Sequence, residues 1–289
     1  MRKNLLVSGS VLLFVFCAVD SANILAHFFV PSVSHQYVFQ PIWKELSLRG
    51  HNVTVITPNP LKDPNLINLT EIDVSFAYNF PKDVDISNSR REFSSPFTII
   101  NTFYYLFKYT MQMQMEDEKF KNILKQSEDS FDLILVETGN MIGYGLKHKF
   151  NAPLISISSL PSSVFTQYSI GNPAHPVVYP DVLTESFGDL SIWQKIDSIY
   201  VLLTTWLMAQ FFIVPDATEM GRFYFGEDMP DVQELMRQSV FLENVNPIFS
   251  NKRPNVPNMK EFWNVHLNRD INPPKVSYFI CLIFLQSTH

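Results

Sequence analysis

Cysteine is nearly absent from this 289-residue chain, which holds only Cys17 and Cys281. Cys17 lies in an amino-terminal segment with the pattern of a secretory signal peptide, so Cys281 alone is expected in the mature protein. An intramolecular disulfide is then excluded, and the stability of the fold must come from a substantial hydrophobic core. No cluster of cysteine and histidine has the spacing of metal ligands, so the sequence predicts no metal site.

Basic residues are too few and too scattered for a surface that binds nucleic acid. The chain has 22 lysines and arginines against 28 aspartates and glutamates, which gives a formal net charge of −6. Without a basic block, nucleic acid is not an expected partner. The glycine pattern that starts at Gly139 reads G-x-x-x-G-x-G. It differs from the dinucleotide-binding G-x-G-x-x-G order, so it indicates close helix packing and no nucleotide cofactor.

Apolar and aromatic residues are abundant. Hydrophobic residues form 46% of the chain, and 25 residues are phenylalanine, which suits a large core, an apolar pocket or a surface that faces a membrane. At the amino terminus, two basic residues precede the apolar run 5–19, and small residues follow at 21 and 22. We expect residues 1–22 to be a signal peptide and the remaining chain to enter the lumen of the endoplasmic reticulum.

Apolar strands and amphipathic helices alternate along the chain. Short strand–helix–strand connections predict parallel strands with right-handed crossovers, and therefore a doubly wound α/β sheet. The first helix is expected to have Ser34 as its N-cap and to stop at Gly50. A loop is expected at 161–180, which is rich in proline and serine. The expected strands cover 23–30, 52–57, 69–77, 131–137, 153–158 and 239–245, and the expected helices cover 35–49, 98–126, 141–150 and 192–214.

Two ionisable residues are expected at the carboxyl edge of the sheet, where open α/β sheets bind their ligands. His35 follows the first strand, and a helix amino terminus there would keep the imidazole neutral and able to act as a base. Glu137 ends a buried strand and can hold the His35 ring as a triad carboxylate does. On position alone, a loop-filling histidine and a helix-capping or solvent-facing glutamate remain the alternatives.

Several motifs closely resemble the amino-terminal half of UDP-glucuronosyltransferases and related UDP-glycosyltransferases, the insect members in particular. The similarity covers residues 23–275 and is carried by short strings, of which Arg-Gly-His-Asn-Val-Thr is the most specific. The matching segments are Pro31–His35, Leu46–Pro58, Phe131–Glu137, Ala152–Ser158, Phe241–Asn246 and Arg253–Pro257.

The resemblance implies a fold and a mechanism. The fold would be the first Rossmann-like domain of a GT-B glycosyltransferase. His35 would be the general base that takes a proton from an acceptor hydroxyl, with inversion at the sugar carbon and no metal. Glu137 would orient His35 at a position where the family commonly has aspartate. A catalytic group displaced by ~1 Å can cost about 10²-fold in rate, so the longer arm needs compensation by its neighbours.

The resemblance also implies the reactants, which would serve detoxification. The acceptor would be a small lipophile that contacts Ser34, Ser158 and Phe165, with selectivity set by the 161–180 loop and the 98–126 helical region. The co-substrate would be UDP-glucose or UDP-glucuronate, bound by a second domain, and no other cofactor is implied.

The expected domains are a signal peptide at 1–22, an acceptor-binding domain at 23–275 and an atypical tail at 276–289, interpreted as read-through from an intron. The donor-binding domain and the carboxyl-terminal membrane helix of the family are not recognised in the sequence, so we expect no activity from the chain alone. The alternative is a non-catalytic lipophile-binding protein, or a regulatory partner that forms a hetero-oligomer with full-length transferases. The apolar helix at 192–214 is too short for a confident membrane span and suggests packing or membrane association.

Two glycosylation sequons suit a lumenal protein. Asn52 opens an expected strand and should be inaccessible. Asn68 lies beside an expected loop and is the predicted glycosylation site.

Overall fold

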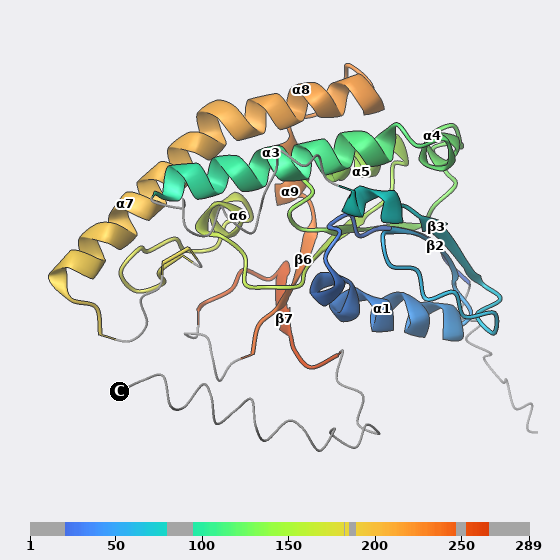
Figure 1. Cartoon of the computed structure of the whole chain (residues 1–289), viewed down its shortest axis with the longest axis horizontal. Coiled ribbons are helices and arrows are strands. Elements are labelled where there is room, and N and C mark those ends of the chain that lie inside the picture. Colours follow the sequence, from blue (N-terminus) through green and yellow to red (C-terminus); the bar gives the residue numbers. More distant parts are fainter. Residues whose placement is uncertain (1–20, 80–94, 182, 185–188, 247–252, 266–289) are drawn as a thin grey trace, which may run out of the picture.

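A computed structural model describes residues 21–79, 95–181, 183–184, 189–246 and 253–265. Residues 1–20 of the predicted signal peptide and the predicted tail at 276–289 lie outside the described residues. The described chain forms one parallel sheet with helices on both faces (Figure 1).

The sheet has the strand order β3-β2-β1-β4-β5-β6-β7 within the described residues, and every neighbouring pair is parallel. The predicted doubly wound α/β class is therefore confirmed. The chain reverses its direction of winding between β1 and β4, which is the point where such sheets form a ligand crevice. The strands are β1 Asn23–His27, β2 Asn52–Thr57, β3 Leu69–Asp73, β4 Leu133–Glu137, β5 Leu154–Ser158, β6 Val240–Asn244 and β7 Met259–Phe262.

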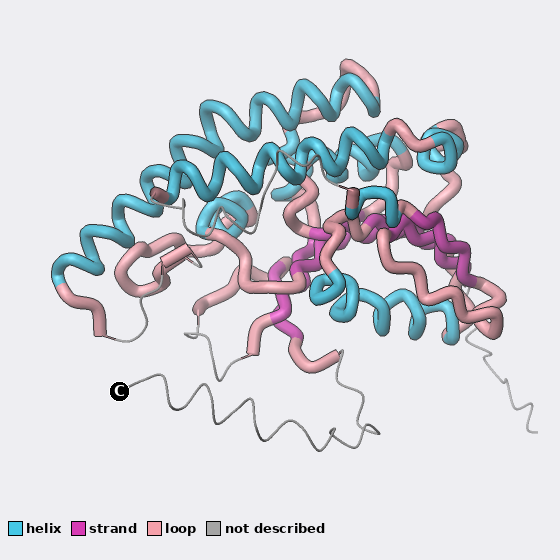
Figure 2. Tube along the Cα trace, in the orientation of Figure 1, coloured by secondary structure: helices cyan, strands magenta, loops and turns pink. Residues whose placement is uncertain are grey.

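Helices cover both faces of the sheet (Figure 2). Helices α3 and α8 lie on one side of the sheet, and α1 lies on the other side (Figure 1). The α-helices are α1 Val33–Leu48, α3 Pro96–Met115, α4 Glu118–Leu124, α5 Gly145–Lys149, α6 Val164–Ser169, α7 Ile192–Met208, α8 Val214–Phe225 and α9 Val232–Arg237, with shorter 3₁₀ segments η1 Ser75–Tyr78 and η2 Ile142–Tyr144 and a π-helical segment η3 Ala209–Ile213.

The alternation of side chains along the strands divides the hydrophobic core into two layers. In β1, Ile24 and Ala26 pack with Trp43 of α1. Leu25 packs in the other layer with residues of α3 and α8, such as Met111. All of these side chains are at least nine-tenths buried. The core on both faces holds the carboxyl ends of β1 and β4 in fixed positions.

The first helix differs from the prediction at its start. Ser32 occupies the N-cap position in an extended conformation, without a side-chain cap hydrogen bond, so the expected cap at Ser34 is wrong. Its end agrees with the prediction, because Gly50 adopts a φ of 92° that favours glycine.

Three other predicted segments differ from the structure. The helix predicted over 98–126 is divided, because the Asp117 side chain accepts from the backbone N–H groups of Lys119 and Phe120 and starts α4. The loop predicted over 161–180 contains α6, which Ser163 caps. The helix predicted over 192–214 continues to Phe225.

The glycines after β4 allow close helix packing, as predicted. A Cβ atom on Gly145 of α5 would lie 2.1 Å from Cδ2 of Phe225 in α8. A side chain at this position would therefore push α8 away from α5 and from the sheet.

The exposure of Asn52 contradicts the prediction, whereas glycosylation of Asn68 stays a prediction. Asn52 is exposed, and Asn68 is half-buried. The Asn52 amide donates to Asn23 Oδ1 at 3.1 Å, at the open beginning of β1 and β2. The expectation that Asn52 is inaccessible is wrong, because an amino-terminal strand position need not lie under a helix.

Candidate active site

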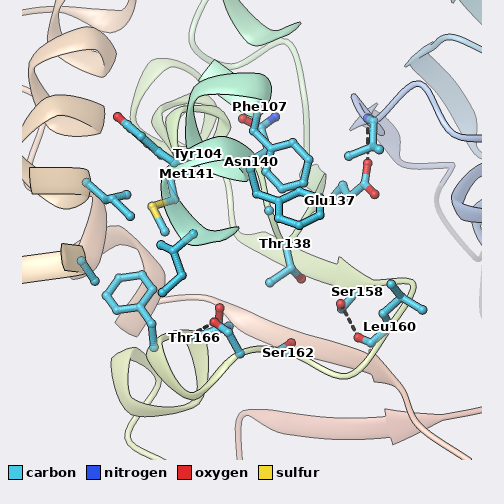
Figure 3. Close-up of a pocket in the computed structure, with 18 of the residues that line it drawn as sticks. Tyr104, Phe107, Glu137, Thr138, Asn140, Met141, Ser158, Leu160, Ser162 and Thr166 are labelled. Atoms are coloured by element: carbon cyan, nitrogen blue, oxygen red, sulfur yellow. Dashed lines mark hydrogen bonds between the residues drawn. The ribbon is translucent and has the colours of Figure 1, made fainter. Parts of the chain in front are cut away.

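A cavity of about 280 Å³ lies at the carboxyl edge of the sheet, beside the winding reversal. Val30, Glu137 and Ser158 line it from the ends of β1, β4 and β5, and α3, α6, α7 and η3 supply most of its apolar walls (Figure 3). Its size is close to the lower end of small-molecule sites, which span ~300–1,000 Å³. The apolar wall residues include Ile99, Ile100, Phe103, Phe107, Met111, Met141, Ile142, Phe165, Ala209 and Ile213.

His35 and Glu137 meet at one end of this cavity. The His35 Nδ1 atom lies 2.7 Å from Glu137 Oε1, and the backbone N–H of Val30 donates to Glu137 Oε2 at 3.0 Å. An ionised carboxylate only accepts hydrogen bonds, so the shared proton belongs to His35 Nδ1. The Nε2 atom of His35 then has a free lone pair and can accept a proton.

Burial makes the ionised form of Glu137 costlier than it is in water. Burial raises the pKa of Glu137, and the hydrogen bonds from His35 and from the backbone at Val30 oppose that rise only partly. Glu137 is 3% exposed, whereas His35 is half-buried. A buried carboxylate is stabilised strongly when a cation forms beside it. Glu137 is therefore suited to a neighbour such as His35 that takes up a proton.

Ser159 is a third member of this group, and the sequence analysis missed it. Its Oγ lies 2.9 Å from His35 Nδ1 and the residue lines the cavity. The only sequence signal was its position directly after β5. The Asn244 side chain donates to the backbone oxygen of Ser159 at 3.0 Å and fixes that turn.

The predicted acceptor-binding residues divide into two groups. Ser158 and Phe165 line the cavity, as the prediction requires of them. Ser34 does not line it: the residue is exposed, and its Oγ lies 3.0 Å from Ser32 Oγ. The placement of Ser34 in the acceptor site is therefore not supported, because neighbouring residues in a helix point in directions about 100° apart.

A polar group joins α3 to α8 at the rim of the cavity. Lys108 Nζ lies 2.6 Å and 2.7 Å from the two carboxylate oxygens of Asp216, and the Tyr104 hydroxyl donates to the same carboxylate. Burial raises the pKa of Asp216, but the bonds from Lys108 and Tyr104 outweigh it and keep the pKa below its usual value. This ion pair fixes the cavity wall formed by α3 against α8.

His27 lies beneath the cavity, fully buried between three elements. Its Nε2 atom lies 2.8 Å from Gln114 Oε1 of α3, and its Nδ1 atom lies 3.2 Å from Asn140 Nδ2. Gln114 Nε2 donates to the Phe29 backbone oxygen, so Oε1 is its acceptor atom and His27 carries its proton on Nε2. Burial lowers the pKa of His27 to about 4, against the hydrogen bond to Gln114 that raises it.

Within the described ranges, no group of three or more His, Cys, Asp or Glu side chains is arranged to hold a metal ion. The site thus combines a histidine, an orienting carboxylate and an apolar cavity. These are the elements of general-base chemistry on a lipophilic ligand.

The chain has clear relatives among characterised sequences, although no family model matches it. It is 32% identical over 271 residues to an ecdysteroid UDP-glucosyltransferase of Lymantria dispar multicapsid nuclear polyhedrosis virus, covering 89% of this chain and 53% of that protein. It is 30% identical over 258 residues to UDP-glucosyltransferase 2 of Dactylopius coccus, covering 86% and 48%. The chain spans about half the length of the curated relatives it matches.

Solved structures that resemble it are glycosyltransferases of low sequence identity. Glycosyltransferase VinC in complex with DTDP is 16% identical, with a TM-score of 0.42 and coverage of 81% of this chain and 52% of VinC. SnogD from Streptomyces nogalater is 11% identical, with a TM-score of 0.43 and coverage of 84% and 51%.

Fold and site together define an α/β protein with a histidine–carboxylate pair at an apolar ligand cavity. The sequence relatives complete the identification. They match almost the whole chain, and each of them is named a UDP-glucosyltransferase or a UDP-glycosyltransferase. The chain belongs to the UDP-glycosyltransferase family, as its motifs indicated.

Proposed function

We propose that the chain is the acceptor-binding half of a UDP-glycosyltransferase of GT-B architecture. It would pass glucose or glucuronate from a UDP-sugar to a hydroxyl of a small lipophile. The observation that carries this proposal is the His35–Glu137 pair, joined at 2.7 Å, at the end of an apolar cavity. Relatives named UDP-glucosyltransferases make UDP-glucose the first donor to test.

The proposed mechanism follows from the free lone pair on His35 Nε2. The acceptor hydroxyl gives its proton to Nε2 while its oxygen attacks the anomeric carbon of the sugar. The new carbon–oxygen bond forms as the bond to UDP breaks, and UDP leaves with the electron pair, which inverts the anomeric configuration. Glu137 stabilises the imidazolium that results, and no step requires a metal.

The longer arm of Glu137 is compatible with this mechanism. One carboxylate oxygen contacts His35 Nδ1 and the other accepts from the Val30 backbone, so both oxygens are fixed. Ser159 contacts the same His35 nitrogen. These neighbours are the compensation that a glutamate needs where the family commonly has aspartate.

Replacing His35 by alanine is expected to abolish sugar transfer and to leave acceptor binding within a few-fold of the unmodified protein. The test measures glucoside formation from UDP-glucose and a panel of phenols, with phenol binding followed by calorimetry. Because the chain spans half the length of its relatives, the assay uses the full chain and a fusion. The fusion adds the part of the Lymantria dispar virus relative that this chain does not match.

The outcomes of this assay distinguish the proposed transferase function from the alternative. Transfer that needs His35 supports the proposal. Transfer that persists in the His35→Ala fusion would overturn the assignment of the base. Saturable phenol binding without transfer in either form supports the alternative, a lipophile-binding or regulatory partner of full-length transferases. The observation behind the alternative is that residues of this chain form an apolar cavity, which can bind a lipophile whether or not sugar transfer follows.

We also propose that the protein is lumenal and rests on a membrane through α7. In the described residues, one continuous helix, Ile192–Phe225, is long and apolar enough to cross a membrane, and only 39% of its most apolar stretch is buried. Large apolar side chains on and next to α7 remain exposed at between 36% and 77% of their area: Ile192, Trp193, Ile196, Ile199, Tyr200, Leu203, Trp206, Leu207, Phe211 and Phe212. Tryptophan and tyrosine favour the membrane interface.

Replacing both Trp193 and Phe211 by serine is expected to reduce binding to phosphatidylcholine vesicles by about tenfold or more, since each loses a large buried area in the lipid. Sedimentation with vesicles measures this. Ile67, which is 89% exposed in the loop before β3, supplies the matched control Ile67→Ser. Equal vesicle binding by the double variant and the control would contradict the proposed membrane face.

A further inference from the structure

Thr205 of α7 has a buried hydroxyl group that no part of the fold satisfies. The residue lines the cavity and is 4% exposed. Its Oγ1 atom has no hydrogen-bond partner among the described residues. Native structures satisfy nearly all buried polar atoms, and an exception in a cavity wall can gain its partner from a molecule bound in the cavity.

Among the described residues, the Thr205 hydroxyl does not form the backbone hydrogen bond that threonine commonly forms within a helix. A threonine within a helix commonly donates to the carbonyl oxygen four residues earlier, as Thr110 does to Leu106 at 2.8 Å. Thr205 makes no such bond in the described structure. In a helix, threonine populates two χ1 rotamers, so its hydroxyl and its methyl group can exchange places at the cavity wall.

Several other polar side chains around the cavity already have partners within the protein. Thr138 Oγ1 lies 2.8 Å from Ser156 Oγ, and Asn140 Oδ1 accepts from the Gly143 backbone at 2.7 Å. Lys108 and Tyr104 are bound to Asp216, as described above. A ligand that met these groups would compete with bonds inside the protein, whereas Thr205 has its full capacity available.

Thr205 belongs to the cavity wall that lies opposite the His35–Glu137 pair. It lines the cavity together with Ala209 and Ile213 of the following π-helical segment. In Figure 3 the helix ribbon of this region borders the cavity on the side away from Glu137, and Met141 lies between them. A ligand whose reacting hydroxyl is at His35 therefore extends its far end toward Thr205 across apolar side chains.

We propose that Thr205 determines acceptor specificity by binding a second polar group at the far end of the acceptor. The preferred acceptors are then two-ended lipophiles, with the hydroxyl that receives the sugar at one end and a hydroxyl or carbonyl at the other. The threonine hydroxyl can donate to a carbonyl and can accept from a hydroxyl, so both classes fit. This inference rests on the proposed function for the assignment of the cavity as the acceptor site.

Two pairs of probes test the proposed role of Thr205, and the members of each pair differ only in the second hydroxyl group. The pairs are 2-naphthol with naphthalene-2,6-diol, and the longer 4-phenylphenol with biphenyl-4,4′-diol. Calorimetry measures the affinity of each probe for the full chain, without a UDP-sugar. Replacing Thr205 by valine keeps the shape and removes the hydroxyl. We expect the affinity for at least one diol to fall by about tenfold, which is the worth of one good hydrogen bond, while the affinity for its single-hydroxyl partner changes by less than about twofold.

The control substitution is Ser198→Ala on the same helix. Ser198 is also buried with an unpartnered hydroxyl, but it does not line the cavity. Ser198→Ala is expected to leave the affinities of all four probes unchanged. If Thr205→Val weakens both members of each pair equally, or neither, the inference fails and the acceptor assignment stands. If no probe binds the unmodified chain saturably, the acceptor assignment and this inference fail together.

A second readout shows whether Thr205 has a structural role instead. Because valine removes an unsatisfied buried hydroxyl, the ligand-free Thr205→Val protein should unfold at the same urea concentration as the unmodified protein or at a higher one. A clear fall in the unfolding midpoint would mean that the hydroxyl has a partner within the protein. That result would overturn the proposed role in acceptor recognition.

Discussion

Replacing Glu137 by glutamine is expected to lower the turnover number of the fusion protein by about 10⁴-fold, the scale seen when a triad carboxylate becomes an amide. The glutamine oxygen would keep the bond from the Val30 N–H, so its amide nitrogen would face His35 Nδ1. That nitrogen donates, so the His35 proton would move to Nε2. The imidazole would then have no lone pair at the atom that must accept the acceptor proton.

Steady-state kinetics with UDP-glucose and a phenol measure this effect. The matched control is Glu116→Gln, which alters an exposed carboxylate that pairs with Lys121 away from the cavity. The control should retain its turnover within a few-fold. Turnover in the Glu137→Gln protein that equals that of the control would show that Glu137 does not set the His35 tautomer.

The conservative variant Glu137→Asp sharpens this test. Aspartate is the residue that the family commonly has, yet here we expect it to lower turnover by about 10²-fold. A side chain shorter by one methylene cannot contact His35 Nδ1 and the Val30 N–H in their present positions. Full activity in Glu137→Asp would mean that the local backbone adjusts to either acid.

The second large effect concerns stability at acidic pH. His27 stays neutral in the folded protein down to about pH 4, whereas the unfolded chain takes up a proton near the ordinary value of 6.5. Between these values the unfolded state binds more protons, so the contribution of His27 to stability is complete above the ordinary value and is lost as the pH falls. The expected loss is about 2 kcal/mol between about pH 7.5 and pH 5.

Urea unfolding of the unmodified protein and of His27→Gln at several pH values isolates this contribution. Burial raises the pKa of Glu137, Asp181 and Glu243, so these carboxylates make the folded state relatively less stable as the pH rises, which is the opposite trend. They are common to both proteins, so their effect cancels in the difference. A difference in unfolding free energy that does not change with pH would show that folding does not lower the pKa of His27.

The sequence predicted most of the sheet because its strands are apolar and short. Positions such as Leu25 and Val136 are buried, and the alternation with helices left few topologies to consider. β7 was missed because Met259–Phe262 has two charged residues in four, which gives no apolar run. α6 was missed because proline, serine and glycine around it indicate a loop, although Ser163 caps a helix there.

The meeting of His35 and Glu137 was predictable from one geometric rule, which is that parallel strands end at the same edge. That rule brought His35 and Glu137 together across 102 positions of sequence. It could not identify Ser159 or Thr205, because their roles depend on which way a side chain points within a turn or a helix. The same limit explains why the sequence did not predict that Ser34, one residue before His35, lies outside the cavity lining.

The π-helical segment at 209–213 limits the insertions and deletions that this part of the chain can accept. The backbone N–H of Val214 donates to the Ala209 carbonyl oxygen, five residues back, so this turn holds one residue more than an α-helix would. Since residues in an α-helix follow each other at about 100°, deleting one residue here would rotate α8 by that angle relative to α7. Ala217 and Met220 would leave the core. Insertions and deletions that surface loops tolerate are therefore not permitted at this point of the chain.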